Sequence, residues 1–173
     1  MPSRCMNSTL IHEGRVFRLH RDHVRLPNGV DTTLDIIRHP GAAAIVPLTP
    51  TGHVLLIRQY RYAAAGHIWE IPAGTMEAGE SPLECARREL GEEIGVAARR
   101  WRTLGQIYPL PAYSDEIIHL FRADDLTPTE QHLDADEILE VHEFSFDDIT
   151  EMIRTGAIRD AKTITGLMMA KAV

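Results

Sequence analysis

Residues 74–96, GTMEAGESPLECARRELGEEIGV, constrain the fold most, because they predict one amphipathic helix with a defined beginning, face and end. Ser81, Pro82 and Glu84 occupy the N-cap, first and third helical positions of a capping box. The apolar side chains recur at three- and four-residue steps and form one stripe: Leu83, Ala86, Leu90 and Ile94. Gly95 then offers a C-terminal stop. The segment therefore predicts a helix that packs on the rest of the protein by this stripe.

Three glutamates, Glu89, Glu92 and Glu93, gather near the end of this predicted helix. One interpretation is a solvated face with ordinary i,i+4 pairs, for which Arg88 and Glu92 have the right spacing. Against it, acidic side chains near a helix C-terminus face the negative end of the macrodipole, and like charges at i,i+4 repel. A bound divalent cation removes both penalties. Carboxylates without thiolates suit Mg²⁺ or Mn²⁺, so the pattern predicts Mg²⁺-dependent phosphate chemistry, with Mn²⁺ as the alternative ion.

The composition excludes several classes of protein. The net charge of -7 argues against a nucleic-acid partner, because such partners are bound mainly through Lys and Arg. The N-terminus lacks the apolar run of a signal peptide, and we find no segment long and apolar enough to predict a membrane span. The spacing of Cys5 and Cys85 suggests neither a disulfide framework nor a zinc site, which fits a reducing, cytoplasmic location.

The chain of 173 residues predicts about one domain of mixed α/β or α+β sandwich class. Asn28-Gly29 predicts a hairpin turn between strands over residues 16–26 and 32–37. The other predicted strands cover residues 42–48, 53–60, 67–71, 101–108, 116–123 and 139–146. Two further helices are expected near the C-terminus, the first ending at Gly156 and the second capped by Asp160. We expect residues 1–40 to form an N-terminal β appendage and residues 41–173 the main domain.

The spacing of Gly74, Glu80 and the run RELGEEIGV over residues 88–96 resembles the Nudix box at every defined position. This resemblance implies an α/β/α sandwich with a mixed sheet. It implies that Glu89, Glu92 and Glu93 are metal ligands, joined by the carbonyl of Ala73, and that Arg88 orients them. Glu80 is expected in a supporting role.

The flanking residues resemble the ADP-ribose pyrophosphatases of that family. Two segments are similar to motifs of that subfamily: Arg58-Gln59-Tyr60-Arg61 and the segment from Glu70 to Gly74. This similarity implies substrate contacts for Arg58, Arg61 and Glu70. Pro111 and the loop after it resemble the downstream proline and loop of this subfamily and imply that Glu116 is the general base. Leu110 and Ala112 depart from the Ser and Gly that are common there.

The resemblance implies hydrolysis of ADP-ribose to AMP and ribose 5-phosphate by a homodimer that exchanges N-terminal strands. The first alternative is a pyrophosphatase for another nucleoside diphosphate sugar, such as GDP-mannose. The others are a non-catalytic sensor that binds ADP-ribose and a structural cation site without turnover.

Overall fold

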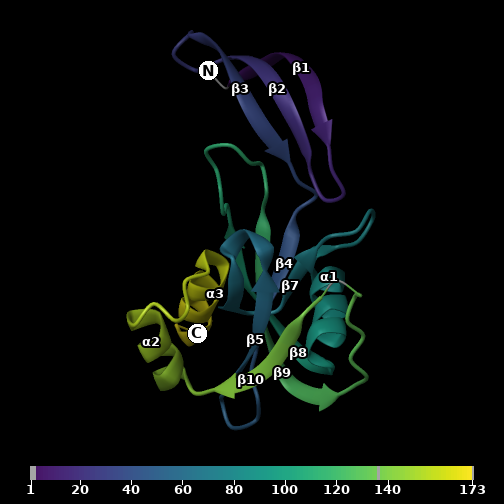
Figure 1. Cartoon of the computed structure of the whole chain (residues 1–173), viewed down its shortest axis with the longest axis vertical. Helices are drawn as coiled ribbons and strands as arrows, with labels where there is room; N and C mark the ends of the chain where they lie inside the picture. The colour runs from purple at the N-terminus through teal and green to yellow at the C-terminus, as the bar shows by residue number, and fades with distance from the viewer. Residues whose placement is uncertain (1–2, 136, 173) are drawn as a thin grey trace.

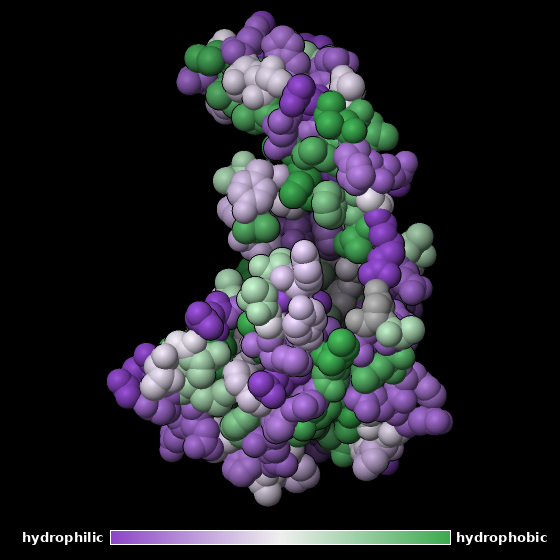
Figure 2. Space-filling view, viewed as in Figure 1, coloured by the Kyte–Doolittle hydropathy of each residue, from purple (hydrophilic) through white to green (hydrophobic). Residues whose placement is uncertain are grey.

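The computed structural model describes residues 3–135 and 137–172. An N-terminal sheet stands apart from a core in which helices pack on two further sheets (Figure 1). A narrow waist separates the N-terminal sheet from the core in the space-filling view (Figure 2). Within the described residues, no helix is long and apolar enough to cross a membrane.

The N-terminal sheet is antiparallel and has the strand order β1-β2-β3. Its strands are β1 (Arg4–Glu13), β2 (Arg18–Arg25) and β3 (Asp31–Arg38). The hairpin predicted around Asn28-Gly29 is confirmed, with Gly29 at a positive φ of 85° that suits glycine. β1 was not predicted, because its residues are all exposed and carry no apolar alternation. The sheet lies within residues 1–40, and its folding as a separate domain stays a prediction.

The core contains a mixed sheet with the order β7-β4-β9-β8, in which β4 and β9 are parallel and the other pairs antiparallel. Its strands are β7 (Ala73–Thr75), β4 (Ala42–Pro47), β9 (Ile118–Pro128) and β8 (Val96–Ile107). A second, antiparallel sheet has the order β10-β5-β6. Its strands are β10 (Leu139–Phe144), β5 (Val54–Arg61) and β6 (Gly66–Glu70), with a 3₁₀ turn at Tyr62–Ala64 before β6.

β4 lies at the centre of the sandwich, and every one of its residues is buried. Ala44 and Val46 pack with the C-terminal helices α2 (Phe146–Arg154) and α3 (Ala161–Lys171). Ala43 and Ile45 face the other way, toward α1 (Pro82–Glu89). A strand covered on both faces needs apolar residues at every position, which explains the continuous run AAAIVP. The predicted α+β sandwich with an N-terminal antiparallel sheet is confirmed.

The helix α1 begins as its sequence predicts. The Glu84 backbone N–H donates to Ser81 Oγ at 3.3 Å, and the Ser81 N–H donates to Glu84 Oε2 at 2.8 Å. The last turn, η2 (Leu90–Ile94), is π-helical, and Gly95 ends it at a φ of 72°. π-Helical turns are rare and occur often at functional sites. β8 starts directly afterwards at Val96, earlier than predicted, because residues 96–98 and 100 pair with β9 although Ala97 and Ala98 have weak strand propensity.

Candidate active site

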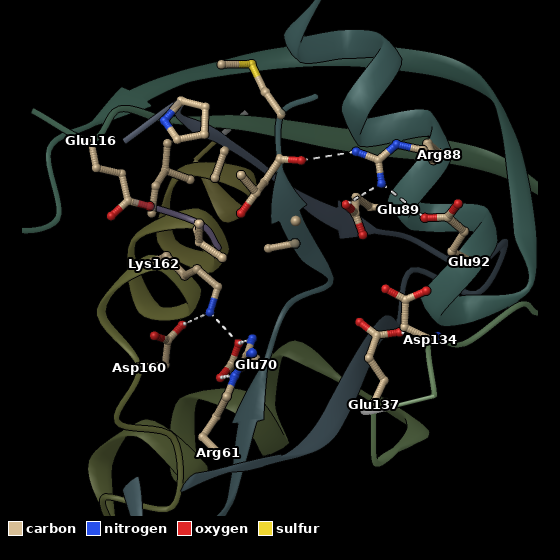
Figure 3. A pocket seen from close by; sticks show the side chains of 18 of the residues that line it. Arg61, Glu70, Arg88, Glu89, Glu92, Glu116, Asp134, Glu137, Asp160 and Lys162 are labelled. Carbon is tan, nitrogen blue, oxygen red and sulfur yellow. Dashed lines mark hydrogen bonds and ion pairs between the residues drawn. The ribbon is translucent and has the colours of Figure 1, made fainter. Parts of the chain in front are cut away.

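A cleft of about 960 Å³ lies between the core and the end of the N-terminal sheet. Its walls come from β6, β7, α1, the loop before β9, the loop before β10 and the start of α3. Figure 3 shows Glu89 and Glu92 on one side of this cleft, with Glu116 and Lys162 across from them. Among the described lining residues, Asp and Glu outnumber Arg and Lys. The cleft therefore presents an excess of negative charge.

Arg88 is the centre of an ion-pair network on α1. Its guanidinium donates to both carboxylate oxygens of Glu80 at 2.9 Å, and its Nη1 donates to Glu89 Oε1 at 2.6 Å and Glu92 Oε2 at 3.1 Å. A further bond, from Nη2 to the Thr75 carbonyl at 3.1 Å, ties the helix to β7. The Glu80 hydrogen bonds raise the pKa of Arg88, and the same bonds lower the pKa of Glu80 to about 2. Arg88 thus orients the carboxylates, and Glu80 orients Arg88.

Two of the predicted metal ligands, Glu89 and Glu93, are buried carboxylates, 7% and 1% exposed. Burial raises the pKa of Glu93 to about 8, and the nearby charge of Glu89 adds to the rise. The Ala73 N–H donates to Glu93 Oε2 at 2.9 Å and opposes it. Burial also raises the pKa of Glu89, against the neighbouring Arg88 charge. These carboxylates lie where a charged form needs more positive charge than the protein supplies.

Gly74 explains how the Glu89 carboxylate reaches β7. A Cβ atom at position 74 would stand 1.7 Å from Glu89 Oε1 and 1.9 Å from its Cδ. Glycine is therefore required here by close approach. The absent side chain leaves room for the carboxylate beside the backbone of Ala73 and Thr75.

The residues present fit a divalent cation by the chemistry of their donors. Among the described residues, no three His, Cys, Asp or Glu side chains converge tightly enough to form a complete metal site. Arg88 instead engages Glu89 and Glu92. Glu89, Glu92 and Glu93 offer carboxylate oxygens at or just beneath an acidic cleft, and Gly74 admits the Glu89 carboxylate. Oxygen donors of this kind suit Mg²⁺ and Mn²⁺. The solvated-face interpretation holds for the Arg88–Glu92 pair, but it is wrong for the buried Glu89 and Glu93.

The opposite wall carries a second charged group. Arg61 donates to both oxygens of Glu70 at 2.9 Å, and Lys162 donates to Glu70 and, at 3.0 Å, to Asp160. Burial acts to raise the pKa of Glu70, but the bonds from Arg61 and the charge of Lys162 outweigh it, so the pKa is lowered. The Glu70 carboxylate thus holds two positively charged side chains, Arg61 and Lys162, at the wall of the cleft.

Glu116 lines the cleft from the loop before β9, and its side chain is 20% exposed. Its backbone N–H donates to Ser114 Oγ at 3.2 Å. The His39 ring lies beside this carboxylate, with Nδ1 3.8 Å from Glu116 Oε1. That nitrogen accepts the Gly41 N–H at 3.0 Å, so in the neutral ring it has no proton to donate to Glu116.

The structure brings together at or just beneath the cleft the following predicted site residues: Arg61, Glu70, Ala73, Arg88, Glu89, Glu92, Glu93 and Glu116. Arg58 is not among the residues that line it. Its guanidinium lies 3.8 Å from Glu140 on the neighbouring strand, and its contact with substrate stays a prediction.

Sequence reasoning missed several charged lining residues, among them Asp134, Glu137 and Lys162. Asp134 and Glu137 belong to the loop before β10, and the Glu137 charge contributes to the raised pKa of Glu89. Lys162 follows the Asp160 cap of α3 by two residues, and its bond to Glu70 spans 92 positions of the chain, which the local sequence does not reveal.

Comparisons with known proteins find relatives that match most of this chain. An ADP-ribose pyrophosphatase of Bacillus subtilis (strain 168) is 38% identical over 155 residues, covering 88% of this chain and 84% of the relative. A GDP-mannose pyrophosphatase of Yersinia enterocolitica is 34% identical over 169 residues, covering 90% and 88%. A crystal structure of an ADP compounds hydrolase superposes with a TM-score of 0.86 at 22% identity, over 99% of this chain and 94% of that one, and shows the shared fold.

The NUDIX domain profile matches residues 38–167, which include the core sheets, α1 and most of α3. The matched residues contain the Arg88 network, the buried carboxylates and the Glu116 loop. Sequence pattern, fold and relatives thus agree, and the chain belongs to the Nudix family.

Proposed function

We propose that this Nudix hydrolase cleaves the pyrophosphate bond of ADP-ribose to release AMP and ribose 5-phosphate. The observation that carries the proposal is the arrangement of carboxylates in the cleft. Glu89 and Glu92, which Arg88 holds, lie on one side, and Glu116 lies on the other. The relative from Bacillus subtilis supports the choice of substrate.

Nudix hydrolases use divalent metal ions, and Mg²⁺, with Mn²⁺ as alternative, suits this donor set. Glu89, Glu92, Glu93 and the Ala73 carbonyl would hold the ion. When bound, it supplies charge neutralisation of the pyrophosphate and a lowered pKa for a bound water. Without a cation, the acidic cleft would repel a pyrophosphate, so the ion is a condition of substrate binding.

The chain's own residues supply the remaining steps. Arg61 is fixed by its two bonds to Glu70 and lies at the cleft wall, where it can donate to phosphate oxygens. Glu116 accepts a proton from the attacking water while the new phosphorus–oxygen bond forms and the bridging phosphorus–oxygen bond breaks. Such a base contributes roughly 10²–10⁴-fold in rate. Arg88 keeps Glu89 and Glu92 in position.

A second candidate is the same hydrolysis of another nucleoside diphosphate sugar, because the GDP-mannose pyrophosphatase from Yersinia enterocolitica is 34% identical over most of this chain. A non-catalytic sensor and a purely structural cation site are weaker candidates. Neither explains why Glu116 lies across the cleft from the predicted metal ligands Glu89 and Glu92.

The test is incubation of the purified protein with Mg²⁺ and, separately, ADP-ribose, GDP-mannose, UDP-glucose, NADH and a nucleoside triphosphate, with chromatography of the products. We expect AMP to form fastest from ADP-ribose and Glu93→Gln to abolish the reaction. Glu84→Gln is the matched control, because Glu84 is in the same helix and Gln keeps the oxygen that accepts the Ser81 N–H. Faster cleavage of GDP-mannose would favour the second candidate. Binding of ADP-ribose without products would favour the sensor.

A further inference from the structure

The loop that carries Glu116 is attached to the end of the N-terminal sheet. The Ile37 N–H at the end of β3 donates to the Tyr113 carbonyl at 2.8 Å, and the Asp115 N–H donates back to the Ile37 carbonyl at 3.1 Å. Ile37 and Ser114 form a parallel bridge between these two bonds. Residues 113–115 thus pair alongside the end of β3 through two backbone hydrogen bonds.

The Asp115 side chain adds two contacts with the same segment. Its Oδ1 accepts the His39 N–H at 2.9 Å, and its Oδ2 accepts from Arg38 Nη1 at 3.1 Å. Arg38 also forms an ion pair with Asp22 of β2, which is 3% exposed and accepts the Ser8 hydroxyl at 2.6 Å. A connected set of polar contacts therefore runs from β1 through β2 and β3 to the residue directly before Glu116.

The residue after Glu116 is held as well. The Ile117 carbonyl accepts the Ala42 N–H at 3.0 Å, where β4 and β9 begin to pair. Glu116 is therefore flanked on both sides by residues bonded to residues 37–42. The tip of the loop has little packing of its own, since Leu110 and Tyr113 are 43% and 46% exposed. Its position depends on these polar contacts.

We infer that Asp115 and Arg38 are positioning residues that hold Glu116 over the cleft, and that the N-terminal sheet thereby belongs to the catalytic apparatus of each chain. This inference rests on the proposed function of Glu116. A general base works only within hydrogen-bond reach of the proton that it removes, and a displacement of about 1 Å can cost roughly 100-fold in rate. The ends of the loop are fixed by backbone pairing, and the Asp115 carboxylate fixes the position between them.

The kinetic test uses Asp115→Ala, which removes both side-chain bonds from a half-exposed position. Asp115→Asn is the graded variant, because its oxygen can still accept the His39 N–H. We expect Asp115→Ala to lower kcat for ADP-ribose by roughly 10- to 100-fold with KM changed less than about threefold, and Asp115→Asn to lose less. Asp31→Ala is the matched control, since it breaks an exposed two-bond pair with Arg25 at the far end of the same sheet.

A double-mutant cycle shows whether the loss acts through Glu116. Glu116→Gln alone should lower kcat by roughly 10²–10⁴-fold. Adding Asp115→Ala to it should then cost less than about twofold more, because a misplaced residue without base function cannot lose rate. A kcat of Asp115→Ala within about twofold of the unchanged protein overturns the inference. A full, additive loss in the Glu116→Gln background also overturns it.

Hydrogen exchange tests the attachment without any substrate. Amides in residues 113–117 should exchange at least about tenfold faster in Asp115→Ala than in Asp31→Ala, while those of α1 stay unchanged. Unchanged exchange in the loop overturns the inference even if ADP-ribose is hydrolysed. If ADP-ribose stays intact, the proposed function fails, and exchange still decides whether Asp115 holds the loop.

Discussion

The Arg88 side chain both ties α1 to β7 and holds two of the predicted metal ligands. It is paired with Glu80, Glu89 and Glu92 and also reaches β7 through the Thr75 carbonyl. The Arg88 side chain is 25% exposed, so the network is only partly screened by solvent. Removal of the Arg88 guanidinium would leave the carboxylates of Glu80, Glu89 and Glu92 without this positive charge.

We expect Arg88→Ala to lower the free energy of unfolding of the metal-free protein by about 2 kcal/mol or more, because Glu89 lies buried beside it. Saturating Mg²⁺ should reduce this loss, since the ion replaces part of the missing positive charge. Urea unfolding in EDTA and in Mg²⁺ measures both. Arg87→Ala is the control from the adjacent, exposed position. An equal loss with and without Mg²⁺ would contradict a shared role of Arg88 and metal.

Glu93 predicts a pH dependence of stability in the metal-free protein. Its pKa is about 8 in the folded state, against an ordinary value of 4.5. Between these values the folded state binds more protons than the unfolded state, so the free energy of unfolding falls as pH rises, by at most about 1.4 kcal/mol per pH unit. Glu70 has a lowered pKa, and its contribution is lost only at more acidic pH.

The measurement is urea unfolding in EDTA at several pH values between about 5 and 8. Glu93→Gln should flatten the slope, because the amide does not titrate. Mg²⁺ should flatten it as well by favouring the ionised carboxylate. A free energy of unfolding of the unchanged protein that stays level or rises over this range would refute the role assigned to Glu93.

At the scale of elements, the close contact between α1 and β7 decides where the carboxylates lie. β7 is short and pairs with β4 at the sheet edge, and Gly74 in its middle admits the Glu89 carboxylate. The capping box sets where α1 starts, and the π-helical turn that follows carries Glu92 and Glu93. Strand and helix together therefore position the predicted metal ligands.

Gly74→Ala should displace the Glu89 carboxylate, because the new Cβ atom would stand 1.7 Å from Glu89 Oε1. We expect Mg²⁺ affinity to fall roughly 10- to 100-fold, in the range found when the support of a metal ligand is disturbed. Titration calorimetry with Mg²⁺ measures the affinity. Gly66→Ala is the control, since no heavy atom lies within 4 Å of its added Cβ. Equal affinities of the two variants would remove Gly74 from this role.

At the scale of the whole molecule, the faces of the N-terminal sheet are left uncovered by the described residues of the core (Figure 1). β1 is exposed throughout and pairs with β2 along one edge. The sheet also exposes apolar side chains that include Leu10, Ile11 and Leu34. An exposed edge strand and exposed apolar side chains offer a surface for pairing with another chain, and a second copy of the chain is the partner that the family resemblance predicts.

We expect a homodimer in sedimentation equilibrium at micromolar concentration. Leu10→Asp should shift the equilibrium toward monomer, because a carboxylate would be buried in the contact. Ile138→Asp is the control, since Ile138 is 61% exposed and lies outside the N-terminal sheet. A monomeric unchanged protein would refute the predicted dimer.

Several features follow from local sequence because their causes are local. The capping box of α1, the stop at Gly95 and the turn at Gly29 each depend on residues within one turn of the chain. The apolar runs of β4 and β5 reflect burial and identify core strands wherever they pair. The Nudix box spacing likewise determined the family and its acidic helix.

Other features exist only after distant segments meet. Lys162 reaches Glu70 across 92 positions of the chain, and Asp115 reaches Arg38 across 77. The raised pKa of Glu93 depends on its burial beneath β7, which the sequence pair Glu92-Glu93 does not reveal. Sequence by itself determined the helix, its carboxylates and the family. The tertiary structure decided which carboxylates are buried, which are paired and which line the cleft, because burial and long-range pairing depend on the packing of the whole chain.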